Sequence, residues 1–189
     1  GMMVMLGVNE APRQAFAVGG IRHWKDGRNM PDVHATNYYY GDLPVYMRLN
    51  LATEMPETYR FQGSKGILEV TGSSLTFTPQ TSQDSYPSYY AYSFPKALRD
   101  AYFAQWHAEN DARVSKEATS ETINYRAAND YDDIVPHLAN FFNAVRSRKP
   151  VVEDAVFGHH AALACHMANE SYFRRAVVKW DEAGQVITE

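Results

Sequence analysis

Two polar side chains on one face of a predicted strand are the first candidates for ligand binding. Residues 45–53 alternate apolar and polar types, which predicts a strand with one core face and one polar face. Arg48 and Asn50 fall on the polar face, where a guanidinium and an amide can hydrogen-bond sugar hydroxyls. A face turned to solvent or to another subunit carries the same residue types, so both interpretations stay open.

Three further candidates come earlier in the chain. His34 lies on a predicted strand at 32–40, where it either faces a ligand cleft or packs against neighbouring side chains. Trp24 and Lys25 lie at the end of the first predicted strand, next to an Asp-Gly turn. An indole beside a charged group suits a polyol, but a turn covered by a tryptophan has the same composition.

The sequence lacks the patterns typical of a nucleotide or metal site. A dinucleotide site needs a strand, a G-x-G-x-x-G turn and a helix N-terminus, and no such pattern is present. The Gly-Ser-Lys-Gly segment at 63–66 lies between predicted strands, so we interpret it as a hairpin turn. His159, His160 and His166 lack the i, i+4 spacing that places two ligands on one metal. We therefore predict no catalytic, cofactor-binding or metal-binding residue in this chain.

Length and composition indicate one globular domain. The chain has 189 residues, of which 45% are hydrophobic and 21% charged, with a net charge of −4. That composition permits a sizeable core, and the charge argues against nucleic-acid and membrane partners. No signal peptide is visible, so we expect a cytoplasmic location. The single cysteine, Cys165, is predicted to be a buried thiol within a helix.

The elements that must position the candidates are strands first and helices afterwards. Strands are predicted at 14–24, 32–40, 45–53, 58–62, 67–70, 75–78 and 176–180. Helices are predicted at 95–110, 134–149 and 154–173. This order predicts an α+β fold with an open, mostly antiparallel β-sheet and helices packed on one face. The segment 81–129 is interpreted as an insertion, and its polar part at 109–129 is predicted to be a connecting loop.

The helix predicted at 134–149 carries an apolar stripe. Its members recur at helical spacing, which predicts one buried face; they are Ile134, Leu138, Phe141, Phe142 and Val145.

Three stretches of the chain resemble one oxidoreductase family. They are GGIRHWKDGRNMPDVHATNYYY (19–40), YRFQGSKGILEV (59–70), and HLANFFNAVRSRKPVVED with GHHAALACHMANESYFRRAVVKWD (within 137–181). In this order they resemble the C-terminal domain of the Gfo/Idh/MocA family, which includes glucose–fructose oxidoreductase and inositol dehydrogenase. The segment 81–131 has no counterpart in that resemblance.

The resemblance implies a fold and a role. The fold is the dihydrodipicolinate-reductase-like α+β domain, with 1–189 as a single C-terminal domain for substrate binding and oligomerisation. NAD or NADP would bind in an upstream Rossmann domain, the substrate would be a sugar or polyol, and the sheet would form a homodimer or higher homo-oligomer. The family's Glu-Lys-Pro and Asp-x-x-x-His motifs are missing, so we expect no cofactor bound to this chain and no catalysis by it alone.

A tyrosine-rich segment supports two other interpretations. Tyr86, Tyr89, Tyr90 and Tyr92 lie among serines and a proline, and their rings suit either sugar stacking or a protein interface. The chain would then be a stand-alone carbohydrate-binding module or an assembly module, in both cases without catalysis.

Overall fold

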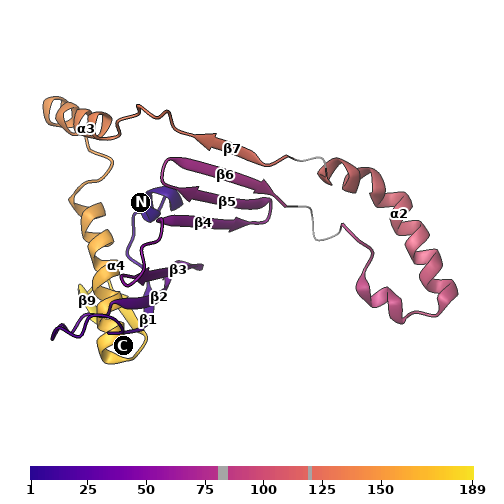
Figure 1. The fold of residues 1–189 in the computed structure, drawn as a ribbon, viewed down its shortest axis with the longest axis horizontal. Helices are drawn as coiled ribbons and strands as arrows, with labels where there is room; N and C mark the ends of the chain where they lie inside the picture. Colours follow the sequence, from indigo (N-terminus) through magenta and orange to yellow (C-terminus); the bar gives the residue numbers. More distant parts are fainter. Residues whose placement is uncertain (81–84, 119–120) are drawn as a thin grey trace. The chain divides into compact units, whose positions relative to one another are not determined.

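The computed structural model describes residues 1–80, 85–118 and 121–189. These residues form two compact units, one comprising Gly1–Met55 and Asp132–Glu189, the other Pro56–Tyr131 (Figure 1). The described part of the predicted insertion at 81–129 belongs to the second unit. Residues 81–84 and 119–120 lie outside the described residues. The number of independent domains stays a prediction.

The first unit is built on a five-stranded antiparallel sheet in the order β3-β2-β1-β8-β9. Its strands are β1 (Gln14–Gly20), β2 (Val33–Tyr40), β3 (Leu43–Asn50), β8 (Val178–Asp181) and β9 (Val186–Thr188). A two-residue turn joins β2 to β3, and its Gly41 has a φ of 60°. Positive φ costs glycine little, so this turn pairs the two strands along their full length.

Helix α4 (Ala155–Arg174) covers one face of this sheet. It begins where Asp154 accepts a hydrogen bond from the Phe157 amide at 2.9 Å, which satisfies one of the free donors of the first turn. Small and flexible side chains on its buried face allow close packing; the core contains Leu163, Ala164, Met167 and Ala168 from the helix, with Ala15, Tyr38, Tyr40 and Val178 from the strands. A short helix, α1 (Met2–Leu6), precedes β1.

Helix α3 (Ile134–Ser147) forms where the sequence predicts a helix, but its apolar stripe is exposed. No residue of α3 is buried, and Phe141 is 53% exposed. The prediction of a buried stripe was therefore wrong. Helical periodicity shows that one face is apolar, but it does not identify what covers that face.

Cys165 is also exposed, contrary to the prediction of a buried thiol. The helix rotates Leu163, Ala164, Met167 and Ala168 towards the sheet, and Cys165 lies outside that arc. The run of small residues around it indicated close packing without showing which of them face the sheet.

The second unit contains its own antiparallel sheet in the order β4-β5-β6-β7. Its elements are β4 (Thr58–Gly63), β5 (Gly66–Thr71), β6 (Ser74–Pro79), the 3-10 helix η1 (Tyr89–Ser93), α2 (Lys96–Ala118) and β7 (Ile123–Arg126). The α+β class with antiparallel strands is confirmed, whereas the strands divide between two sheets instead of forming one.

The polar segment after residue 108 was predicted as a loop, but it contains the end of α2 and all of β7. Side-chain pairs one turn apart stabilise this part of α2. Gln105 donates to Glu109 at 2.9 Å, and Arg113 donates to Glu117 at 3.0 Å. Such pairs stabilise a helix that lacks a clear apolar stripe, so periodicity alone missed it.

Gly66 occupies a position in the second sheet that leaves no space for a side chain. Its φ is 150°, and a Cβ would lie 2.4 Å from the Thr78 carbonyl oxygen and 2.9 Å from the Phe77 ring. Its cross-strand partner Gly63 has room, because the nearest atom to a Cβ there is 3.7 Å away. Of this pair, only Gly66 therefore has to be glycine.

We expect Gly66→Ala to lower the free energy of unfolding by about 1–3 kcal/mol, because it adds both a clash and a strained φ. Gly63→Ala is the matched control and should leave stability unchanged or slightly raised. Urea denaturation of the two variants measures the difference. Equal stability of both would contradict this account of the β4–β5 hairpin.

Candidate functional site

Arg48 and Asn50 lie on the face of the first sheet that is opposite α4. In the strand register they pair with Ala35 and Val33, whereas the intervening Leu49 pairs with His34 on the helix side. The Arg48 side chain is exposed. The Asn50 side chain accepts a hydrogen bond from the Ala52 amide at 3.0 Å, so it stabilises the turn that follows β3.

His34 lies on the other face, beneath α4. It is 6% exposed, and its ring centroid is 5.8 Å from that of Tyr172. Its Nδ1 is 3.2 Å from the Thr36 hydroxyl oxygen. Burial lowers the pKa of His34 below its ordinary value, so the ring is neutral at pH 7. His34 therefore cannot act together with Arg48 and Asn50 on one ligand.

Trp24 and Lys25 lie in a loop that a buried carboxylate holds in place. Asp32 accepts backbone hydrogen bonds from Arg22 and His23 at 2.7 Å and from Trp24 at 3.0 Å. Burial by itself would raise the pKa of Asp32, but these amide hydrogen bonds outweigh it and lower the pKa to about 2.

The half-buried ring of Trp24 is contacted by a cation of its own loop. The Arg28 guanidinium carbon lies 5.0 Å from the Trp24 ring centroid, which is cation–π distance. Arg28 is in turn held by Asp26 at 2.6 Å. This arrangement matches the interpretation of a turn covered by a tryptophan. Whether any of the five predicted residues contacts a substrate stays a prediction.

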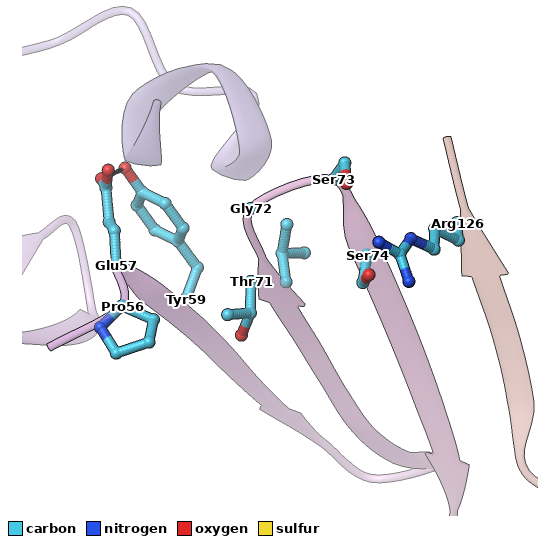
Figure 2. A pocket seen from close by; sticks show the side chains of 9 residues that line it. Pro56, Glu57, Tyr59, Thr71, Gly72, Ser73, Ser74 and Arg126 are labelled. Carbon is cyan, nitrogen blue, oxygen red and sulfur yellow. Dashed lines mark hydrogen bonds between the residues drawn. The ribbon is translucent and has the colours of Figure 1, made fainter. Parts of the chain in front are cut away.

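The second unit contains a depression of about 490 Å³ that the sequence did not indicate. Figure 2 shows it at one end of the sheet, around the β5–β6 turn. It is lined by Pro56, Glu57, Tyr59, Val70, Thr71, Gly72, Ser73, Ser74 and Arg126.

The strand register places one cation beside a row of hydroxyl groups in this depression. Thr58, Thr71, Ser74 and Arg126 are cross-strand neighbours on β4, β5, β6 and β7, so their side chains share one face. Thr71 donates a hydrogen bond to the Thr58 hydroxyl at 3.3 Å. A guanidinium fork beside aliphatic hydroxyls is a suitable set of donors for an oxyanion.

In the next cross-strand row on the same face, the arginine is neutralised by a carboxylate. Arg60 pairs with Glu69 at 2.7 Å, and Thr76 donates to Asn124 at 2.9 Å. Within the described part of the chain, Arg126 has no carboxylate partner. Arg126 therefore leaves an uncompensated positive charge at this end of the sheet.

The acidic and aromatic side chains of the depression come from the other face of the sheet, because Tyr59 follows Thr58 on β4 and side chains alternate along a strand. The Tyr59 hydroxyl donates a hydrogen bond to the Glu57 carboxylate, which raises the pKa of Tyr59. Figure 2 shows Glu57 and Tyr59 on one side, and Arg126 with Ser74 on the other. The depression therefore has an acceptor end and a cationic end.

Sequence analysis missed these residues for different reasons. Tyr59 lies on a predicted strand with no pattern that marks it as a ligand-binding residue, and Arg126 lies in a segment predicted to be a loop. These residues come together through the pairing of β6 with β7, which joins segments that are far apart in the sequence. No local pattern contains that information.

The first unit has a second depression, of about 510 Å³, between β1 and the C-terminal end of α4. Its lining is mostly apolar and includes Phe16, Val18, Tyr172 and Phe173, with Arg175 as its charged member. Across residues 1–80, 85–118 and 121–189, no cluster of three His, Cys, Asp or Glu side chains is suitable for a metal ion. No helix in the same ranges has the length and apolar character needed to cross a bilayer.

Comparison with known proteins gives a likeness of fold. No protein-family model matches the sequence, and no curated protein matches it. A candidate oxidoreductase from Bacillus subtilis, yvaA, has a similar structure with a TM-score of 0.50 and 11% identity, over 95% of this chain and 47% of that chain. A candidate oxidoreductase from Bacteroides fragilis NCTC 9343 has a TM-score of 0.49 and 9% identity, over 95% of this chain and 48% of its own.

This chain therefore spans about half the length of the solved structures it matches. At such low identity the likeness shows a shared fold. Membership of the predicted family stays a prediction.

Because Asp32 anchors the 21–31 loop, we expect the thermal stability of the protein to depend on the charge of this carboxylate. The Asp32 pKa is lowered from about 4 to about 2, so its stabilising effect is complete above about pH 4 and is lost as the pH falls towards 2. Asp32→Asn should lower the melting temperature at pH 7, because the amide offers only one acceptor oxygen. The difference from the unsubstituted protein should shrink below about pH 4.

Circular dichroism melts between pH 2 and 7 measure this effect. Asp42→Asn, in the exposed turn between β2 and β3, is the control and should behave like the unsubstituted protein. If Asp32→Asn melts at the same temperature as the unsubstituted protein at pH 7, the loop does not depend on this carboxylate.

Proposed function

We propose that this chain is the substrate-side and oligomerisation domain of an NAD(P)-dependent sugar or polyol oxidoreductase. The observation that carries the proposal is the extent of the fold likeness, which covers 95% of this chain and 47% of the B. subtilis candidate oxidoreductase. A chain equivalent to one half of such a protein would supply one wall of a substrate cleft. The other half would supply the cofactor.

Within the described ranges, the residues of this chain do not fit a dinucleotide. Pyrophosphate binding needs a glycine-rich turn between a strand and a helix. In the described residues, β6 is followed by η1 and β7 by α3, and neither connecting sequence contains a glycine. The proposal therefore assigns NAD or NADP to a part of the protein outside this chain, and no catalytic step is assigned to residues within it.

The open face of the first sheet supports the oligomerisation part of the proposal. Because α4 covers the opposite face, apolar side chains remain exposed here, among them Phe16, Val18, Tyr39 and Tyr46, the last of which is 64% exposed. Exposed aromatic and aliphatic side chains grouped on one sheet face, beside the polar Asn37 and Arg48, are typical of an interaction site. A sheet face can meet its own copy about a two-fold axis, which makes a homodimer the simplest assembly.

A second candidate function is a carbohydrate-binding module without catalysis. Tyr86, Tyr89 and Tyr90 are each about four-fifths exposed, which leaves their rings available for stacking on sugars. Such stacking would not need the other half of an oxidoreductase. An intact protein that binds sugars but never reduces NAD or NADP would favour this candidate.

The cofactor assignment is tested by isothermal titration calorimetry. We expect no saturable heat when this chain is titrated with NAD or NADP to millimolar concentration, because it offers no pyrophosphate cradle. The protein that carries its natural flanking sequence should bind one of them and reduce it in the presence of a polyol. Saturable binding of either dinucleotide to this chain alone would contradict the proposal.

The oligomerisation assignment is tested with two matched charge substitutions. Val18→Asp places a carboxylate on the open sheet face and should dissociate the oligomer, because a charge would be buried without a partner. Val152→Asp makes the same change at an exposed position between α3 and α4 and should leave assembly intact. Light scattering after size-exclusion chromatography measures the mass, and circular dichroism checks the fold. A monomeric unsubstituted protein would contradict the assignment.

A further inference from the structure

We propose that the depression lined by Glu57, Tyr59, Ser74 and Arg126 binds a small hydroxylated anion, a sugar acid or a sugar phosphate, with its oxyanion on Arg126. The site stands on the geometry of the second unit alone. It goes beyond the proposed function because it names a ligand class and a position within this chain. It does not depend on the presence of a cofactor half.

Arg126 carries a positive charge that no acidic side chain of the described residues neutralises. It ends β7, is exposed, and has no acidic partner in the described residues, whereas Arg60 on the same face is neutralised by Glu69. A planar guanidinium binds carboxylate and phosphate groups through two parallel hydrogen bonds. An unpaired arginine in a depression is therefore suited to an anionic group from a ligand.

The backbone position of Arg126 is fixed although the residue lies on an edge strand. Arg126 is the cross-strand neighbour of Ser74. The next residue, Ala127, donates its amide to the Ser73 carbonyl oxygen at 2.9 Å, which holds the end of β7 against the β5–β6 turn. The backbone from which the guanidinium extends is thus ordered before a ligand arrives.

Hydroxyl donors are available around the position of the anion. The Ser73 and Ser74 hydroxyls make no hydrogen bond within the described residues, and both line the depression. A phosphate or carboxylate has more acceptor sites than one guanidinium can fill, so these hydroxyls can satisfy the remainder.

The acidic side of the depression determines which chemical groups the rest of the ligand can carry. The Glu57 carboxylate already accepts from the Tyr59 hydroxyl and has further acceptor capacity for ligand hydroxyls. It also repels a second anionic group from that side. The anionic group therefore binds on the Arg126 side, and the hydroxyl groups of the ligand extend around the end of the sheet towards Glu57. A volume of about 490 Å³ is in the range of small-molecule sites.

The test is calorimetric titration of the full chain with D-gluconate, D-glucose 6-phosphate, D-glucose and inorganic phosphate. We expect saturable binding of gluconate, glucose 6-phosphate or both, and the comparison of the two identifies the preferred oxyanion. Glucose and inorganic phosphate should each bind at least about tenfold more weakly, because each lacks one half of the recognised chemistry. Inorganic phosphate binding as tightly as the sugar anions would overturn the proposal.

Two substitutions separate this site from general charge effects. Arg126→Gln should weaken binding by about tenfold or more, the loss typical of a hydrogen-bonded charge pair. Lys65→Gln removes the same charge from the β4–β5 turn at the other end of the sheet and should leave affinity unchanged. Ser74→Ala should weaken binding by a few-fold and leaves the charge intact. Urea midpoints establish that each variant is folded.

Three results would overturn the proposal: no sugar anion binding at tens of millimolar, equal affinity of the unsubstituted protein and Arg126→Gln, or equal weakening by Lys65→Gln. None of these affects dinucleotide binding by the protein with its natural flanking sequence. Failure of this site is therefore distinguishable from failure of the proposed oxidoreductase role.

Discussion

The packing of α4 on β1 and β2 is the constraint on which the first unit depends. Two buried hydrogen-bonding groups fix it. The Ser171 hydroxyl accepts from the Ala17 amide at 2.8 Å and donates to the Ala176 carbonyl at 2.6 Å, while Tyr38 donates to the Ala164 carbonyl at 3.1 Å. Leaving a buried partner unsatisfied costs about 1–3 kcal/mol, so these bonds fix the helix over one face of the sheet.

The face of the sheet that α4 covers determines which strand side chains are accessible to ligands. Side chains alternate across a strand, so His34 is covered by the helix while Arg48, on the open face, is exposed. The same alternation in the second sheet gathers hydroxyl groups and Arg126 on one face at one end. Candidate residues that look equivalent in the sequence therefore have different access to ligands.

The described chain exposes more apolar surface than a self-sufficient monomer usually does. The stripe on α3, with Phe141 and Phe142, and the open sheet face, with Val18 and Tyr46, both lack cover within their own unit. Such surfaces cost free energy in water unless a partner removes them from it. The proposed oligomer and the proposed second half of an oxidoreductase are two partners that would lower this cost.

The sequence by itself determined the local elements. The start of α4 at Asp154, the β2–β3 hairpin and the existence of α3 follow from caps, turn residues and periodicity, each set by neighbours a few positions away. Only the tertiary structure decided that the strands form two sheets, that Cys165 and the α3 stripe are exposed, and that Arg126 lies beside Ser74. Those outcomes depend on which distant segments pair and cover one another, and a local pattern does not specify its distant partner.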